Sequence, residues 1–374
     1  MPIPRSRSTF GDERVDLAIT KILALVGNDA NDDLVRSMVV TSLDMDVANL
    51  SRLDLKIANQ TLVEILNAWD VFSPYEQRPK VTIFGSARTK PDTPDFDLAR
   101  TFAETMTGRG WMTITGAGPG IMTAGIEGAG PDAAFGVNIS LPFEQQASSL
   151  FSDTRKLATF KYFFTRKLTF MKESDAFVVF PGGFGTLDEA FELLTLIQTG
   201  KSFPAPVVLI DHDESSYWDS WQQFVERELL DQGMISPADM GLFLHTHDAA
   251  EAADYVSDFY RCYHSIRFVG RRLVIRLRQP VSDRTLAALN DEFGDIVTSG
   301  AIERIETTSA EQRDDDVVDL PRLGFRFDHR SYARLVVLIR RINELGSDSP
   351  GVADGFVHDI APDPETNNHG DDDG

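Results

Sequence analysis

The sequence predicts an α/β protein built on a Rossmann-like parallel sheet with helices on both faces. Three observations support this prediction. Between residues 79 and 263, short apolar strands alternate with helical patterns, as in a parallel sheet that is covered on both sides. Two glycine-rich loops in this region each follow a strand and lead into a helix. No run reaches the roughly 18 consecutive apolar residues of a membrane span, so we expect no membrane partner.

The predicted N-terminal segment, residues 1–78, is helical and contains no strand. Apolar residues recur there at helical spacing in two stretches: Val15, Ile19, Ile22, Leu23 and Val26, then Leu55, Ala58, Leu62, Leu66 and Trp69. Gly27 supplies a stop for the first stretch. We expect a helical cap that packs on the next domain or on a second subunit.

The predicted Rossmann-like domain occupies residues 79–263. Its expected strands are apolar throughout and fall at 80–84, 111–115, 135–139, 176–180, 207–210 and 242–244. Helical spacing marks residues 96–106, 160–171 and 187–197, and a further helix carries Trp218 and Trp221. Strands without an exposed polar face are expected to be buried from both sides.

A small α+β module is predicted at residues 264–346. Residues 272–278 alternate with period two, and a helix at 286–293, strands at 302–307 and 323–327 and a helix at 332–345 follow. This order suggests a ferredoxin-like sandwich, serving either as a packing module or as a ligand-sensing one. Residues 347–374 contain eight acidic residues, three prolines and no Lys or Arg, which predicts a disordered acidic tail.

Charge and cysteine content narrow the class of protein. The 374 residues include 36 Lys and Arg against 58 Asp and Glu, a net charge of −22, which argues against a nucleic-acid partner. The first residues are basic but lack the apolar run of a secretory signal, so we expect a cytoplasmic protein. Cys262 is the only cysteine, which excludes an internal disulfide, and we expect it to be a buried structural thiol.

Glycine-rich loops at strand ends predict a site for a phosphorylated ligand. Ligands of open parallel sheets bind at the carboxyl ends of the strands, and helix N-termini there favour phosphate. Glycine lets a phosphate approach the backbone N–H groups. The expected substrate- or phosphate-binding residues in these loops are Gly85, Ser86, Gly118, Gly120, Gly182, Gly183, Gly185 and Thr186.

Three better-known sites fit poorly. The loop at 116–120 reads GxGxG rather than GxGxxG, and Asn138 replaces the acidic residue expected of a dinucleotide site. Gly200-Lys201-Ser202 resembles the end of a P-loop but follows a helix and lacks the earlier glycine, so an ATPase is not expected. His245 and His247 have no carboxylate at a spacing typical of a metal site, so we expect no metal.

A carboxylate follows the second glycine loop. Glu189 lies three residues beyond Thr186 and is expected in the first turn of the helix, beside the bound phosphate. It could activate water or stabilise positive charge developing at a sugar C1′, as carboxylates do in glycoside hydrolysis. Arg166 and Lys167 could hold the phosphate or keep Glu189 ionised. The plainer alternative is that Glu189 only compensates the helix dipole.

At these residues the sequence resembles a known family. PGGFGTLDE matches the PGGxGTxxE signature of the LONELY GUY (LOG) family, whose members are often mislabelled as lysine decarboxylases. Arg166-Lys167 stands where the family has an Arg-Lys pair, and TGAGPGIM and GVNISLPFEQ resemble two further stretches of it. The resemblance covers about residues 80–263. Ala117 departs from it, because many members have glycine there, and alanine fits if its φ is negative.

The resemblance implies a homodimer or higher homo-oligomer that hydrolyses nucleoside 5′-monophosphates, AMP-like or of cytokinin type, without a metal or other cofactor. It implies that Arg166 and Glu189 are the catalytic pair, and that Gly182, Gly183, Gly185 and Thr186 form the phosphate loop. The preferred base stays open. The alternative is a carrier that binds a nucleotide or molybdenum cofactor without cleaving it. Lysine decarboxylation would require a lysine Schiff base with pyridoxal phosphate, and no lysine lies in a recognisable site of that kind.

Overall fold

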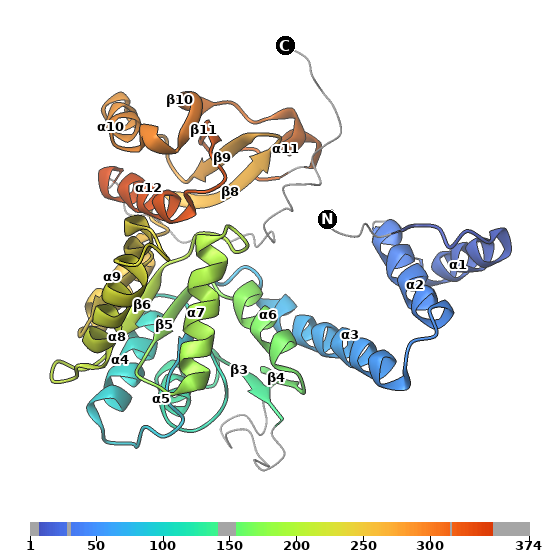
Figure 1. The fold of residues 1–374 in the computed structure, drawn as a ribbon, viewed down its shortest axis with the longest axis horizontal. Coiled ribbons are helices and arrows are strands. Elements are labelled where there is room, and N and C mark those ends of the chain that lie inside the picture. The colour runs from blue at the N-terminus through green and yellow to red at the C-terminus, as the bar shows by residue number, and fades with distance from the viewer. Residues whose placement is uncertain (1–6, 28–30, 141–154, 315, 347–374) are drawn as a thin grey trace. The chain divides into compact units, whose positions relative to one another are not determined.

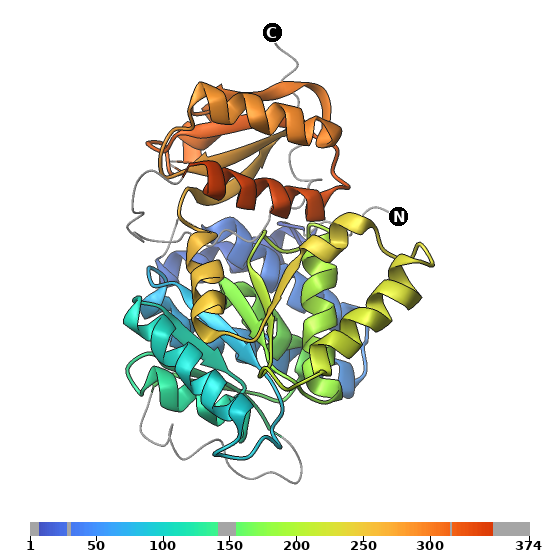
Figure 2. The same cartoon turned by 90° about the vertical axis from the view of Figure 1, so that its left-hand side faces the viewer.

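The computed structural model describes residues 7–27, 31–140, 155–314 and 316–346 (Figures 1 and 2). The chain divides into two compact units, Met1–Glu64 and Ile65–Gly374. The predicted acidic tail, residues 347–374, lies outside the described residues, as does the LPFEQ part of the LOG-like stretch. Every helix in the described ranges is too short or too polar to span a bilayer.

The first unit consists of helices, as predicted. It contains α1 (Glu13–Val26), α2 (Asp32–Val47) and most of α3 (Arg52–Phe72), which continues into the second unit. The Asp12 side chain caps α1 by accepting hydrogen bonds from the backbone N–H groups of Arg14 and Val15. Gly27 ends α1 with a φ of 74°, which confirms the predicted stop. Ile19, Leu23 and Val40 form a small core between α1 and α2.

The centre of the second unit is a seven-stranded parallel sheet, which confirms the predicted α/β class. Its strands are β1 (Lys80–Phe84), β2 (Met112–Thr115), β3 (Ala134–Ile139), β4 (Leu157–Phe160), β5 (Ala176–Val179), β6 (Val207–Ile210) and β7 (Phe243–Thr246). They lie in the order β4-β3-β2-β1-β5-β6-β7, and every neighbouring pair is parallel. The edge strand β4 was not predicted. The helix expected over residues 160–171 begins only at Phe163, because residues 157–160 pair with β3.

Helices cover both faces of this sheet (Figure 2). α4 (Pro94–Gly108), α5 (Ile121–Ala129) and α9 (Ala249–Asp258) contribute to the core on one face. α6 (Phe163–Glu173), α7 (Phe184–Gln198), α8 (Tyr217–Phe224) and the end of α3 contribute to the core on the other face. Alternate residues of one strand serve the two cores: Val178 belongs to the first, and Phe177 and Val179 belong to the second. This alternation explains why the strands are apolar at every position.

The remaining strands form a separate antiparallel sheet. It comprises β8 (Tyr263–Val269), β9 (Arg272–Leu277), β10 (Val297–Ile305) and β11 (Arg322–Phe327), in the order β10-β11-β9-β8, with α10 (Asp283–Phe293), α11 (Ser309–Asp314) and α12 (Tyr332–Leu345). The predicted α+β character is confirmed. The ferredoxin-like order is wrong, because β8 and α11 were not predicted and the elements run ββαβαβα. Short 3-10 helices span Ser73–Tyr75, Pro237–Gly241 and Gly294–Ile296, and a π-helix at Val225–Leu230 extends α8.

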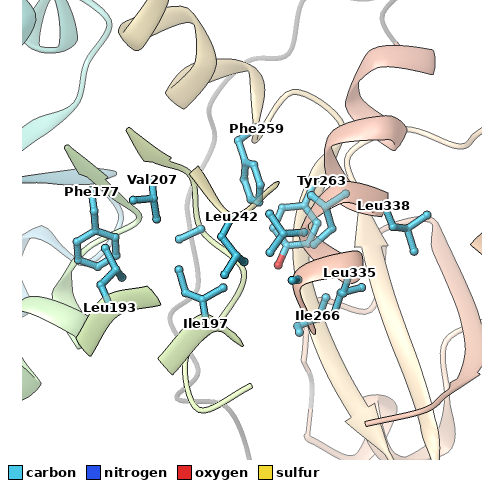
Figure 3. Close-up of a cluster of buried hydrophobic side chains, with 14 of the residues drawn as sticks. Phe177, Leu193, Ile197, Val207, Leu242, Phe259, Tyr263, Ile266, Leu335 and Leu338 are labelled. Atoms are coloured by element: carbon cyan, nitrogen blue, oxygen red, sulfur yellow. The ribbon is translucent and has the colours of Figure 1, made fainter. Parts of the chain in front are cut away.

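One hydrophobic core runs from the parallel sheet into the antiparallel sheet (Figure 3). Phe177 and Leu193 lie at one end of it and Leu338 at the other, with Phe259 and Tyr263 between them. The buried side chain of Asn343 in α12 fastens the connecting segment. Its Oδ1 accepts hydrogen bonds from the N–H groups of Cys262 and Tyr263, and its Nδ2 donates to the carbonyl of Phe259. Cys262 is a free and buried thiol, as predicted.

Candidate active site

The predicted glycine loops meet where the strand order reverses. β2 lies on one side of β1, and β5, which comes much later in the chain, lies on the other. Such a switch point opens a crevice at the carboxyl ends of the strands, where ligands of open α/β sheets bind. The backbone of Ser86, just after β1, joins all three loops. Its N–H donates to the carbonyl of Pro181 at 3.1 Å, and its carbonyl accepts from the N–H of Ile121 at 3.1 Å.

Gly120 makes this close approach possible. Its φ is 70° and its ψ is −132°, and a Cβ on it would lie 2.2 Å from the carbonyl oxygen of Ser86. Packing between loops also explains Gly85, where a Cβ would lie 2.6 Å from Cγ2 of Ile121. At Gly118 a Cβ would meet only the flexible end of Met122, at 2.7 Å from its Cε. The Ser86 hydroxyl accepts a hydrogen bond from the N–H of Arg88. A direct contact of these residues with a ligand stays a prediction.

Ala117 adopts a conformation that the sequence did not indicate. Its φ is 56°, in the left-handed region, so the condition under which alanine fits without strain is not met. The side chain is fully buried, and the backbone N–H of Ala117 donates to the hydroxyl of Thr115 at 3.2 Å. For a non-glycine residue this conformation costs about 1–2 kcal/mol. The loop therefore keeps the shape that glycine would favour, at some cost in stability.

The loop after β5 leads directly into α7. Gly183 is the N-cap residue, and Gly183 and Gly185 are exposed, with open space where a Cβ would lie. The N–H groups in the first turn of a helix have no partner within the helix, and the helix dipole adds partial positive charge there. Gly182 is tightly packed, since a Cβ on it would lie 2.1 Å from Oγ1 of Thr186. The open end of α7 is therefore suited to an anion such as a phosphate.

Tyr217 holds this loop from outside the motif. Its hydroxyl, on α8, donates a hydrogen bond of 2.7 Å to the carbonyl of Gly182. Its ring packs edge-on against Trp218, with the ring centroids 4.8 Å apart. Sequence reasoning missed Tyr217, because it lies 35 residues from Gly182 and no motif includes it.

Glu189 lies deeper than the sequence suggested. α7 begins at Phe184, so Glu189 is its sixth residue and lies in the second turn rather than the first. Its carboxylate is 4% exposed and contacts the guanidinium of Arg166 on α6, where Nη2 lies 3.3 Å from Oε1. The guanidinium also packs over the rings of Phe163 and Phe170, at 5.5 and 5.3 Å from their centroids. The two predicted catalytic residues are therefore adjacent, next to the open end of α7.

This ion pair leaves hydrogen-bonding capacity unused. Among the residues that the structure describes, Nε of Arg166 and Oε2 of Glu189 are buried without a hydrogen-bond partner. Burial raises the pKa of Glu189, although Arg166 and Lys167 partly oppose the rise. Burial also lowers the pKa of Arg166, against the opposing effect of Glu189. Two buried polar atoms with no partner are expected where a substrate completes the site.

Lys167 is engaged by other carboxylates. Its ammonium lies 2.8 Å from Oδ2 of Asp188 and 2.5 Å from Oε2 of Glu192, both on α7. Burial alone would lower the pKa of Lys167, but the hydrogen bonds to Asp188 and Glu192 outweigh it and raise the pKa. These contacts hold α6 against α7. The predicted role of Lys167 in phosphate binding stays a prediction. A phosphate would have to compete with Asp188 and Glu192 for the ammonium group.

An apolar cavity of about 270 Å³ lies away from this site. Asp175 and Ala205, just before β5 and β6, line it, together with Phe164, Leu168 and Ile266. It therefore lies near the amino ends of these strands, between the parallel sheet and β8. The described residues that line it include neither Arg166, Glu189 nor the glycine loops, so it is not the site assembled at the switch point.

Comparison with known proteins identifies the domain that contains these residues. Residues 118–256 match a family model described as a possible lysine decarboxylase. A cytokinin riboside 5′-monophosphate phosphoribohydrolase of Arabidopsis thaliana is 32% identical over 101 residues, which cover 27% of this chain and 45% of that protein. A probable enzyme of the same name from Oryza sativa subsp. japonica is 34% identical over 99 residues, 26% of this chain and 44% of that protein. This segment is similar to the enzymes of the LONELY GUY family.

The similarity to LOG proteins covers only part of this chain and part of each relative. The chain spans less than half the length of these two curated relatives. Among solved structures, the molybdenum cofactor binding protein of the phototrophic bacterium Rippkaea orientalis is similar, with 17% sequence identity and a TM-score of 0.36 over 48% of this chain and 96% of that one. The matched segment, residues 118–256, includes Gly118, Arg166 and Glu189 and ends within α9.

Proposed function

We propose that this LOG-family domain hydrolyses the N-glycosidic bond of a nucleoside 5′-monophosphate, either AMP-like or of cytokinin type, and releases the free base and ribose 5-phosphate. The observation that carries the proposal is the buried pair of Arg166 and Glu189, which keeps two polar atoms without partners beside an open helix N-terminus. The names of the curated relatives support the same reaction class.

The spacing along α7 suits a ribose 5-phosphate. Glu189 lies five residues beyond Phe184, which corresponds to about 7.5 Å along the helix axis. A phosphate bound at the first turn would therefore place the sugar along the helix, towards the carboxylate. In this arrangement the loop of Gly182, Gly183, Gly185 and Thr186, of which Gly183 and Gly185 are exposed, binds the 5′-phosphate. A carboxylate that only compensated the helix dipole would be expected in the first turn, whereas Glu189 lies beyond it.

The reaction breaks the bond between C1′ and the base nitrogen, and the electron pair leaves with the base. Ionised Glu189 stabilises the positive charge that develops at C1′ and accepts a proton from the attacking water, whose oxygen forms the new bond to C1′. The departing base takes up a proton. Arg166 keeps the carboxylate oriented, and its unpartnered Nε can donate to the substrate. The raised pKa of Glu189 strengthens it as a base once it is ionised.

We also propose that the active form is a homodimer or a higher homo-oligomer. Large apolar side chains on α6 and α7 are exposed, among them Phe163, which packs against Arg166, and also Phe164, Leu168 and Phe184. An exposed apolar patch of this kind is typical of a surface that another subunit covers. The native mass of the purified chain, measured by light scattering, tests this part of the proposal, and a monomer at working concentration would contradict it.

The test of the reaction is release of free base from a panel of nucleoside 5′-monophosphates, followed by chromatography. Glu189→Gln keeps the shape of the side chain and removes the charge, so we expect at least about a hundredfold loss of kcat, in line with general-base contributions. Glu192→Gln is the matched control, because it makes the same substitution one turn further along α7, on a carboxylate that pairs with Lys167. We expect its activity to stay within about threefold of the parent chain.

Each outcome decides between the open alternatives. Base release that is lost in Glu189→Gln and kept in Glu192→Gln supports the hydrolase and begins to rank the bases. Tight binding of a monophosphate without any cleavage would favour the carrier and remove the catalytic roles of Arg166 and Glu189. Equal loss in both variants would show that the effect comes from the charge of α7 rather than from Glu189.

A further inference from the structure

Two histidines and a buried carboxylate converge at the carboxyl edge of the sheet, outside the site described above. Asp211 directly follows β6, His245 lies in β7, and His247 directly follows β7. β6 and β7 are paired so that Leu209 faces His245 and Ile210 faces Thr246. The sequence showed the two histidines but not this carboxylate, because Asp211 lies 34 residues before His245.

Both imidazoles approach one oxygen atom. Nε2 of His245 lies 3.0 Å from Oδ1 of Asp211, and Nδ1 of His247 lies 3.0 Å from the same Oδ1. One ligand atom from each of the three residues lies within 4.8 Å of the other two. In a tetrahedral zinc site with zinc–ligand distances of about 2.0–2.1 Å, neighbouring ligand atoms are about 3.3 Å apart. The two separations of 3.0 Å are therefore close to those of a zinc site, and the separation between the two imidazole nitrogens is at most 4.8 Å.

The groups behind two of the three side chains also resemble a metal site. Nδ1 of His245 faces Oδ1 of Asp219 at 3.7 Å, so the outer nitrogen of this ring points to a carboxylate. Oδ2 of Asp211 accepts a hydrogen bond from the N–H of Trp218 at 3.3 Å, which orients the carboxylate. Histidine ligands usually donate their second N–H to such a group, and ligating carboxylates are usually hydrogen-bonded in turn.

We propose that Asp211, His245 and His247 bind a divalent transition-metal ion, with zinc as the best fit. Two imidazole nitrogens and one carboxylate oxygen are the donor set of a three-ligand zinc site, which leaves a fourth position for water. Access is provided by His247, whose side chain is 34% exposed, whereas that of Asp211 is completely buried. In the competing arrangement, Nδ1 of His247 carries a proton and donates it to Asp211 in place of binding a metal. The main-chain oxygen of Asp211, 3.0 Å from this nitrogen, is an acceptor for such a hydrogen bond.

A metal here would make the residues that support the glycine loop more rigid, without taking part in the reaction proposed above. Asp211 is hydrogen-bonded to Trp218, whose ring packs against Tyr217, and Tyr217 in turn holds the carbonyl of Gly182. The ion would tie the ends of β6 and β7 to the start of α8.

The test is titration of the metal-free full-length chain with Co²⁺, a spectroscopic substitute for zinc, followed by displacement with Zn²⁺. We expect one equivalent to bind with the intense visible absorption of a four-coordinate ion. His247→Gln can still form hydrogen bonds to Asp211 but is a poor metal ligand, so we expect at least about a hundredfold weaker binding. His212→Ala is the matched control, because this neighbouring histidine contacts Asp95 at 2.8 Å rather than the three proposed ligands.

The expected pattern is strong binding in the parent chain and in His212→Ala and weak binding in His247→Gln, with all three showing the same near-ultraviolet circular dichroism. Absence of equimolar Co²⁺ or Zn²⁺ binding by the parent chain would refute the site and leave the proton-held arrangement. Unchanged binding in His247→Gln would assign the ion to other ligands, such as the histidines at 358 and 369 of the tail, and would also refute it. Because the readout is metal binding, the result does not depend on whether the chain cleaves nucleotides.

Discussion

Removal of Arg166 should make the stability of the chain strongly dependent on pH. In Arg166→Met the unbranched side chain still packs on Phe163 and Phe170, but the guanidinium beside Glu189 is lost. Glu189 then becomes a buried carboxylate without its cation. Because both side chains are largely buried, solvent screens little of the lost interaction.

The size of the effect follows from the burial and the geometry. Breaking a buried ion pair by removing one partner costs about 3–5 kcal/mol. The contact of 3.3 Å is longer than the roughly 2.7–2.9 Å of a strong charge-assisted hydrogen bond, so we expect the lower end, about 3 kcal/mol at pH 8. At pH 5 Glu189 can take up a proton, and the remaining cost is that of a poorly satisfied neutral group, about 1–2 kcal/mol.

The sign of the pH dependence follows from the raised pKa of Glu189. Burial already raises this pKa in the folded chain, and loss of Arg166 removes its largest opposing cause. The folded variant then binds more protons than the unfolded chain, whose glutamates titrate near about 4.3. The free energy of unfolding therefore falls as pH rises from this unfolded value to the folded one, and levels off above it.

The assay is urea unfolding at pH 5 and pH 8 of four chains: the parent, Arg166→Met, Glu189→Gln and the double variant. We expect the loss in Arg166→Met to be larger at pH 8, and the double variant to lie within about 1 kcal/mol of Glu189→Gln at that pH. The reasoning is refuted if Arg166→Met loses the same free energy of unfolding at both pH values. It is also refuted if the double variant is no more stable than Arg166→Met at pH 8.

Two further substitutions test how the loops are held. Gly120→Ala should lower the free energy of unfolding by about 3 kcal/mol or more, because alanine at a positive φ costs about 1–2 kcal/mol and its Cβ would clash with the Ser86 carbonyl. Gly108→Ala is the control, because the space around Gly108 is open, and its unfolding temperature should stay nearly the same or rise. Equal decreases in unfolding temperature in the two variants would contradict this view. Tyr217→Phe keeps the ring and removes the hydrogen bond to Gly182, a loss of about 1 kcal/mol. If the loop binds phosphate, KM for the nucleotide should rise severalfold with kcat nearly unchanged, and an unchanged KM would show that this bond does not position the loop.

The apolar pattern of the sequence located most of the parallel sheet. β1 and β6 lie where they were predicted, because buried strands between helices are apolar at every position. β4 was missed, since it has only four residues and an aromatic helix begins three residues after its end, which hides their pattern. β8 was missed in part because residues 263–265 are polar or aromatic and carry no clear alternation.

Motif and spacing located the two residues of the predicted catalytic pair but not the conformations around them. The signature identifies Arg166 and Glu189, and the structure places them 3.3 Å apart. It could not reveal that Ala117 has a positive φ, because alanine ordinarily avoids this region and no local pattern marks the exception. Nor could it reveal the roles of Tyr217 and Asp211, since strand pairing and helix packing bring distant residues together only in the folded chain.

The shared core between the two sheets changes what the C-terminal module can be. A module joined through a linker can be lost or exchanged, and its neighbour keeps its own stability. Here Leu242 and Ile197 belong to the same buried cluster as Ile266 and Leu335 (Figure 3), so the parallel sheet would present apolar surface to water without the module. The two sheets therefore form one cooperative unit. A mutation that loosens α12 would therefore also destabilise the strands of the parallel sheet, even if it lay far from Arg166 and Glu189.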